Sequence, residues 1–193
     1  APPAWAPLPG AAREIDTVAR LFAPGRRTVV TGREATESQL AAADRSGDLR
    51  QHRYLLIAAH GRLDAANPMA SAVVLGADAA ADGYVTAAEW PGYHLDSELV
   101  VLSACETGLG KVVGGEGITG LPFALFAAGN RGTAMTLWQV DDDSSVRLVA
   151  GLFGELRRGA SPAAALAAAK RALWRDPATR HPFFWAAMVL YGR

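Results

Sequence analysis

Short apolar runs, each ending at a small or polar residue, place the strongest constraint on how this chain folds. Two of them are YLLIAAHG at residues 54–61 and LVVLSAC at residues 99–105. SAVVLG and GTAMTLWQV are further β-rich runs of the same kind. Because the first two runs are apolar throughout instead of alternating, they suit strands buried on both faces, as in a parallel sheet covered by helices.

Helical patterns alternate with these predicted strands. AAREIDTVARLF (11–22) repeats apolar residues at helical spacing and stops at Pro-Gly, and Thr36 with Gln39 resembles a capping box that opens a second helix. RTVVTG (27–32) between them predicts a short strand. Three later helices are expected in GEGITGLPFALFAAG, SSVRLVAGLFGELRRG and SPAAALAAAKRALWRD, and a last strand in HPFFWAAMVLYG. The alternation predicts an α/β three-layer sandwich with a mainly parallel central sheet.

Composition restricts the partners and the compartment. The 193 residues suit one domain, and the formal net charge of zero gives no field that favours nucleic acid or an anionic membrane. The single cysteine excludes an internal disulfide, and neither a signal peptide nor an apolar run of about 20 residues is present. We therefore expect a soluble, cytoplasmic protein. Residues 1–7 are Pro-rich and predict a linker or the boundary of an excised segment, followed by one domain over 8–193.

His60 and Cys105 each follow a predicted strand. Loops beyond the carboxyl ends of parallel strands form the binding crevice of open α/β sheets, so the two side chains are expected to meet if their strands are neighbours. A thiol needs a nearby imidazole to take its proton at neutral pH, which makes Cys105 the candidate nucleophile and His60 the candidate base. The N–H groups of Gly61 and Cys105 are candidate oxyanion donors. The alternative is that the cysteine is a buried apolar residue and the histidine a structural one.

AAHG, LSACETG, GEGITGLPFALFAAG and TLWQVDDDSS together resemble the CHAT domain, a bacterial branch of the caspase, separase and gingipain cysteine peptidases. The resemblance runs from about residue 8 to the end of the chain. It implies a caspase-like α/β sandwich in which His60 and Cys105 form a catalytic dyad. It also implies that Gly61 and Cys105 supply the oxyanion N–H groups.

The chain departs from related families in two respects. The turn around Cys105 reads SACETG where caspases proper have QAC[RQG]G, so caspase specificity for aspartate does not transfer. Family members usually carry an earlier strand at the centre of the sheet, for which this chain shows no candidate. Such domains are often fused to helical repeats or sensor modules, so we expect additional domains in the parent chain.

Three acids, Asp141, Asp142 and Asp143, follow the predicted strand TLWQV. They are suited to capping a helix, and the resemblance also places their loop beside the pocket for the residue before the cut. Because crowded carboxylates favour a cation, we expect Arg, or less strongly Lys, before the scissile bond, with Asp142 as its principal partner.

Other types of site fit the sequence poorly. GLGKVVGGEG, which includes Glu116, lacks the residue spacing of a phosphate-binding loop, and His52, His94 and His181 lack partners at metal-binding spacing. No cofactor and no metal are expected, and no G-x-S-x-G elbow marks a serine hydrolase. The sequence predicts a cysteine endopeptidase that cleaves a protein substrate through a thioester acyl-enzyme. The alternative is a catalytically silent CHAT module with a regulatory or scaffolding role.

Overall fold

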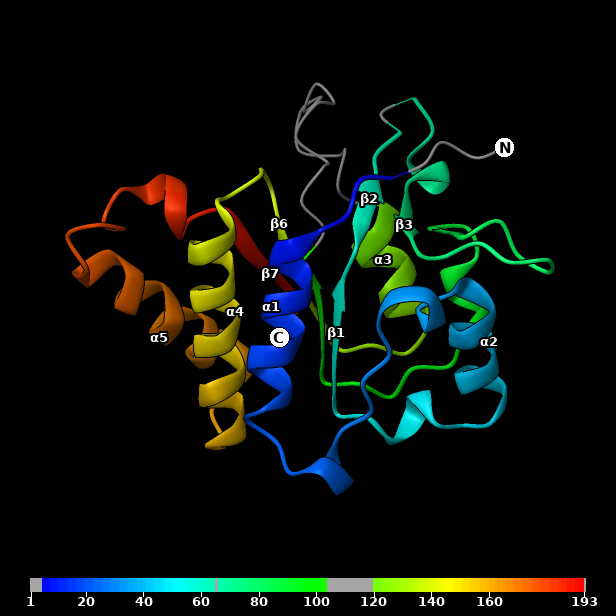
Figure 1. Cartoon of the computed structure of the whole chain (residues 1–193), viewed down its shortest axis with the longest axis horizontal. Coiled ribbons are helices and arrows are strands. Elements are labelled where there is room, and N and C mark those ends of the chain that lie inside the picture. The colour runs from blue at the N-terminus through cyan, green and yellow to red at the C-terminus, as the bar shows by residue number, and fades with distance from the viewer. Residues whose placement is uncertain (1–4, 65, 104–119, 193) are drawn as a thin grey trace.

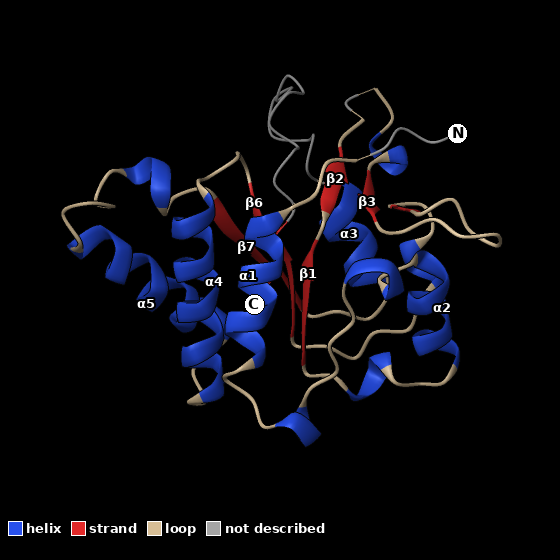
Figure 2. Cartoon of the chain, in the orientation of Figure 1, coloured by secondary structure: helices blue, strands red, loops and turns tan. Residues whose placement is uncertain are grey.

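A four-stranded sheet forms the centre of the molecule, in the order β1-β5-β6-β7. The computed structural model describes residues 5–64, 66–103 and 120–192. The strands are β1 (Tyr54–Ala58), β5 (Leu99–Ser103), β6 (Gly132–Thr136) and β7 (Met188–Gly192). β1, β5 and β6 are parallel and β7 is antiparallel to β6. Figure 2 draws the strands in red and the helices around them in blue. The predicted α/β fold with a mainly parallel central sheet is confirmed.

Helices cover both faces of this sheet (Figure 1). The helices are α1 (Pro9–Ala19), α2 (Glu37–Arg45), α3 (Gly120–Ala127), α4 (Asp142–Arg157) and α5 (Pro162–Arg175). Leu99 and Val101 of β5 belong to the apolar core shared with α1, α4 and α5, whereas Val100 and Leu102 belong to the core shared with α3. Burial on two faces explains why this strand is apolar at successive positions and does not alternate.

A second, smaller sheet is antiparallel and has the order β2-β3-β4. Its strands are β2 (His60–Arg62), β3 (Ala72–Val74) and β4 (Tyr84–Thr86). The run SAVVLG therefore contains a strand, as predicted, but this strand lies outside the parallel sheet. All three residues of β3 are buried, and Val73 packs into the core on the α3 side of the central sheet.

The predicted strand at residues 27–32 is wrong. The segment is not paired as a strand, and Val29 and Val30 are 46% and 36% exposed. Arg27 instead donates to the carbonyl oxygens of Ala19, the last residue of α1, and of Phe22, three residues beyond it. β-Branched residues favour a strand only when a neighbouring strand and a packed face are available, and neither is present here.

The ends of the helices follow the local sequence closely. Thr36 Oγ1 accepts a hydrogen bond from the Gln39 N–H at 3.1 Å, which confirms the predicted cap of α2. Gly129 lies two residues after the end of α3; its φ of +99° suits glycine, and a Cβ there would overlap the Leu95 carbonyl oxygen. Short 3-10 turns complete the chain: η1 (Pro24–Arg26), η2 (Gly32–Glu34), η3 (Leu49–Gln51), η4 (Pro68–Ala70), η5 (Trp90–Gly92) and η7 (Pro182–Phe184).

Candidate active site

The carboxyl ends of β1 and β5 lie side by side. The parallel register pairs Ala58 with Ser103, the last residue of each strand. His60 follows the first strand by two residues, and Cys105 follows the second by two residues. Cys105 and Glu116 lie outside the described residues, so the approach of the thiol to the imidazole stays a prediction. The register provides the neighbouring strand ends that this prediction requires.

His60 is buried, with 7% of its surface exposed, and is oriented by the segment that precedes α1. Its Nε2 lies 2.7 Å from the carbonyl oxygen of Ala6. A carbonyl oxygen only accepts hydrogen bonds, so Nε2 carries the hydrogen, and in the neutral ring the lone pair is on Nδ1. A base whose orientation is fixed by a third group is the usual arrangement beside an activated nucleophile.

Trp5 supports the same imidazole from one side. The two ring centroids are 4.8 Å apart with an interplanar angle of 33°, and the indole N–H donates to the Tyr84 hydroxyl on β4 at 3.3 Å. Neither Trp5 nor Ala6 is a residue that the sequence marks as functional, since both lie in the Pro-rich stretch predicted to be a linker. A tryptophan in such a stretch was the available signal, because large aromatic side chains usually find a packing partner.

Gly61 is buried as the second residue of β2, opposite Val73 of β3. It therefore adjoins His60 with an extended backbone. A side chain is absent at this point of the chain, which suits close approach of a substrate carbonyl. Its role as an oxyanion donor together with Cys105 stays a prediction.

The three acids beside α4 have different partners. Asp141 is the N-cap and accepts from the Ser144 N–H at 3.1 Å. Asp142 and Asp143 face Arg13 of α1, with N···O distances of 3.8 and 2.8 Å. Capping is therefore observed for Asp141. Asp142 and Asp143 already have a cationic partner within the chain, Arg13, which could not be identified from the sequence. The role of these acids in substrate binding stays a prediction.

Glu14 is a further polar residue close to the strand ends. It lies on the buried side of α1, in line with Gly10 and Val18 at successive intervals of four residues, and is 2% exposed. Ser103 of β5 and Ser145 of α4 both donate to its Oε2, at 3.0 and 2.9 Å. Burial raises the pKa of Glu14 to about 7, although the two serine hydroxyls lower it. In the sequence, Glu14 could have been recognised as unusual because it is an acid on the apolar side of an amphipathic helix.

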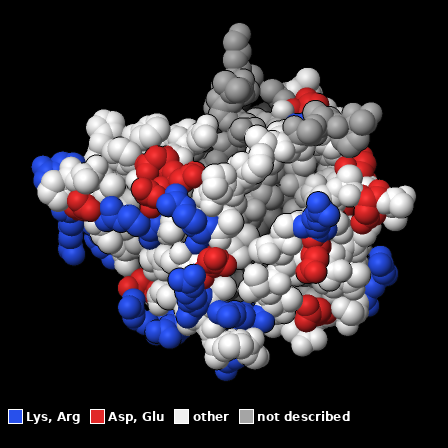
Figure 3. Space-filling view, in the orientation of Figure 1, with Lys and Arg blue, Asp and Glu red and all other residues white. Residues whose placement is uncertain are grey.

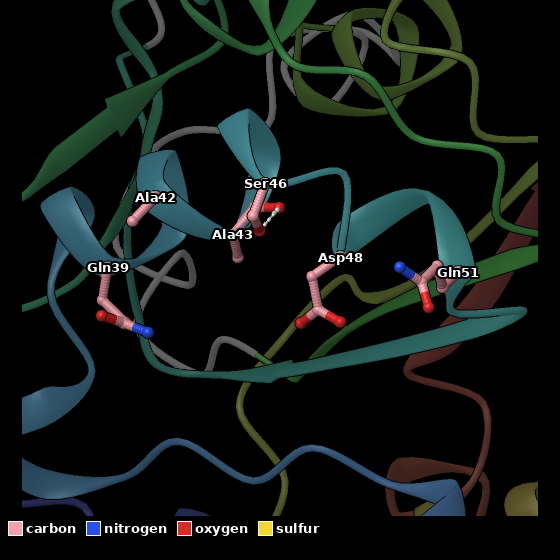
Figure 4. Close-up of a pocket in the computed structure, with 6 residues that line it drawn as sticks. All are labelled: Gln39, Ala42, Ala43, Ser46, Asp48 and Gln51. Carbon is pink, nitrogen blue, oxygen red and sulfur yellow. Dashed lines mark hydrogen bonds between the residues drawn. The ribbon is translucent and has the colours of Figure 1, made fainter.

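Other polar clusters lie away from His60. His94 pairs with Asp44 at 3.2 Å and His52 with Asp48 at 3.6 Å, and within the described parts of the chain no group of three or more potential ligands is placed to hold a metal ion. A hollow of about 500 Å³ lies on α2 and η3 (Figure 4). It is lined by Gln39, Ala42, Ala43, Ser46, Asp48 and Gln51. None of these six is a predicted site residue.

The family model of the CHAT domain matches residues 2–193. The chain belongs to the CHAT domain family. This family is related to the caspase-like cysteine peptidases, in agreement with the resemblance carried by AAHG and LSACETG. On the face drawn in Figure 3 this CHAT domain carries acidic and basic side chains close together. In the part of the chain that the structure describes, no helix has the length and apolar character needed to cross a bilayer.

The CHAT domain is also similar to part of two much longer proteins. It is 32% identical to tetratricopeptide repeat protein 28 of Mus musculus and 31% identical to that of Homo sapiens, over 108 residues in each case. The aligned segment covers 56% of this chain and 4% of each relative. Both relatives are named for tetratricopeptide repeats. This agrees with the expectation that a CHAT domain occurs beside additional repeat domains.

Proposed function

We propose that this CHAT domain is a cysteine endopeptidase in which Cys105 attacks a peptide carbonyl and His60 moves the proton. The observation that carries the proposal is the hydrogen bond from His60 Nε2 to the Ala6 carbonyl. That bond fixes the neutral imidazole in the form with its lone pair on Nδ1, at the strand end next to the one that precedes Cys105.

The proposed reaction has two stages. The thiol of Cys105 gives its proton to His60, and the sulfur attacks the carbonyl carbon to form a tetrahedral oxyanion. Collapse breaks the C–N bond, His60 protonates the leaving amine, and a thioester remains. Water, deprotonated by His60, then attacks the thioester carbonyl. The C–S bond breaks, the carboxylic acid product leaves, and His60 returns the proton to the sulfur. Donation from the N–H groups of Gly61 and Cys105 stabilises the oxyanion in both stages.

Covalent labelling tests this proposal directly. A peptide acyloxymethyl ketone should alkylate Cys105 of the full-length protein, and mass spectrometry should find the adduct on the peptide that contains this cysteine. His60→Ala should slow labelling, because the thiolate then lacks its base. A folded protein that gives no adduct would exclude the peptidase.

A scaffolding or regulatory role is the second candidate. It is favoured by the two relatives, which are named for tetratricopeptide repeats and of which this domain matches only 4%. Such a module would act through its partner domains and would not turn over a substrate. The labelling experiment separates the two functions, since a scaffold does not require an activated thiol.

Removing the indole that packs on His60 should slow the chemistry. An aromatic pair contributes about 0.5–1.5 kcal/mol, so we expect Trp5→Ala to lower kcat by up to about tenfold with a smaller effect on KM. Trp5→Phe should lie between this variant and wild type, because it keeps the ring but not the N–H donated to Tyr84. Trp174→Ala, a change at an exposed tryptophan of α5, is the control. Wild-type kcat in Trp5→Ala would show that the packing does not position the imidazole.

We further propose that Asp142, with Asp141 and Asp143 beside it, favours Arg before the scissile bond. Asp142 is 3.8 Å from Arg13 and its side chain is 58% exposed, so its carboxylate is accessible to a second cation. Asp142→Asn should reduce kcat/KM for Arg peptides by about tenfold and leave Leu peptides unaffected, as read from a peptide library. Asp96→Asn, which alters an exposed ion pair with Arg131, is the matched control. A library preference for Leu or Met, unchanged in Asp142→Asn, would contradict the acidic pocket.

A further inference from the structure

Glu14 is a buried carboxyl group that the proposed reaction does not use. Its Oε2 joins three elements, since α1 carries Glu14, β5 ends at Ser103 and the first turn of α4 carries Ser145. These serines lie 89 and 131 residues from Glu14 along the chain. Ser103 precedes the proposed nucleophile by two residues, and Ser145 follows the three acids 141–143. The contact therefore links the strand end of the candidate dyad to the candidate specificity loop.

The other oxygen of Glu14, Oε1, is buried and has no hydrogen-bond partner among the described residues. A buried, half-satisfied carboxylate destabilises a fold, because desolvation of the charge is only partly compensated. An apolar side chain would fill the same space without this cost. Simple packing of α1 against the sheet therefore does not account for an acid at this position.

Among the residues that the structure describes, few charged groups face Glu14. On α1 itself Arg13 is paired with Asp142 and Asp143 of α4, and the negative charge of Asp142 opposes ionisation of Glu14. β5 carries no titratable side chain between Leu99 and Ser103, and β1 contributes only the phenol of Tyr54. Burial is the main cause that raises the pKa of Glu14 to about 7, so its charge changes within the physiological range of pH.

We propose that Glu14 is a proton-linked positioning residue that, when ionised, holds the end of β5 against the first turn of α4. Hydrogen bonds to a carboxylate are stronger than those to a neutral carboxyl group, so loss of the proton tightens both serine contacts. Gain of the proton loosens them. The consequence for catalysis rests on the proposed peptidase function, whereas the structural link between Glu14 and the two serines does not.

Ionisation has the opposite effect on the stability of the fold. The pKa of Glu14 is raised from its ordinary value of 4.5 to about 7 in the folded protein. Between these values the folded state keeps a proton that the unfolded state has lost. The stability contributed by the neutral group is complete below pH 4.5, decreases as the pH rises towards 7 and is absent above it. Above neutral pH the ionised Glu14 therefore holds the end of β5 more firmly against α4, while the fold as a whole becomes less stable.

Glu14→Gln tests both effects at once. The amide keeps the shape and the acceptor oxygen but carries no charge, so at pH 8 we expect a folding equilibrium constant larger by about a hundredfold and a kcat smaller by about tenfold. Near pH 4.5 the stabilities of the two proteins should converge. Glu155→Gln, at a half-buried glutamate near the end of α4, is the control and should change neither quantity. Equal effects of pH on the stability of wild type and Glu14→Gln would overturn the proposal.

Nuclear magnetic resonance of the Cys105→Ala protein tests the link without any need for activity. The amide signals of Ser103 and Ser145 should shift with the same midpoint as the Glu14 carboxyl carbon, near pH 7. Ser145→Ala should raise that midpoint, because it removes a donor that favours the ionised form. Amides that do not follow Glu14 would overturn the inference even in an active peptidase. Amides that follow Glu14 in a protein without activity would support the link and refute only the proposed function.

Discussion

Protein carrying Cys105→Ala is expected to cleave no peptide and to unfold at the same temperature as wild type. The thiolate is the only nucleophile in the proposed reaction, and no second cysteine is present to replace it. Alanine is close to cysteine in size, so the fold should be retained. Cleavage of a fluorogenic peptide library, measured together with thermal unfolding, checks both statements. Cleavage at the wild-type rate would exclude Cys105 as the nucleophile.

His60→Ala should lower kcat by about a hundredfold to ten-thousandfold, the range lost with a general base. A trace of activity is expected, because a thiol keeps some nucleophilicity without its base. The matched control is His94→Ala, since His94 also pairs with another group, the carboxylate of Asp44 on α2. A loss of similar size in both variants would indicate a general effect on folding and would count against His60 as the base.

The parallel sheet was predictable because its strands carry their own signal. β5 is apolar at four successive positions, and both of its faces are buried in cores that need such residues. The failure at residues 27–32 has the opposite cause. Val29 and Val30 have high β-propensity, but pairing depends on a neighbouring strand that the local sequence does not encode. β-Propensity therefore predicted a strand correctly only where the packing of the fold also requires a strand.

The candidate site was predictable only in part, for a related reason. His60 could be found because it follows a strong strand signal, and parallel strands place their ends together. Ala6, Glu14 and Arg13 act through contacts that join residues 54 to 131 positions apart. No spacing rule identifies such contacts. Trp5 and Glu14 stand out in the sequence only because each is unusual for its surroundings.

Gly61→Val is the most direct test of the oxyanion site. Gly61 lies within β2 and has an extended backbone, which valine adopts readily, so the backbone itself should not be strained by the change. The branched side chain instead occupies space beside the N–H that is proposed to approach the substrate carbonyl. We expect kcat/KM to fall by about a hundredfold or more, the scale seen when an oxyanion donor is lost.

Gly61→Ala provides the graded control for this prediction. A single methyl group displaces the substrate carbonyl less, so Gly61→Ala should lower kcat/KM by only about tenfold, clearly less than Gly61→Val. Because the site is buried, both variants are measured below their unfolding temperatures, and their reaction with a small alkylating agent shows whether Cys105 is still activated. Loss of turnover with unchanged alkylation is the expected result, since the thiolate forms before the oxyanion does. Unchanged kcat/KM in folded Gly61→Val would mean that this N–H does not face the substrate.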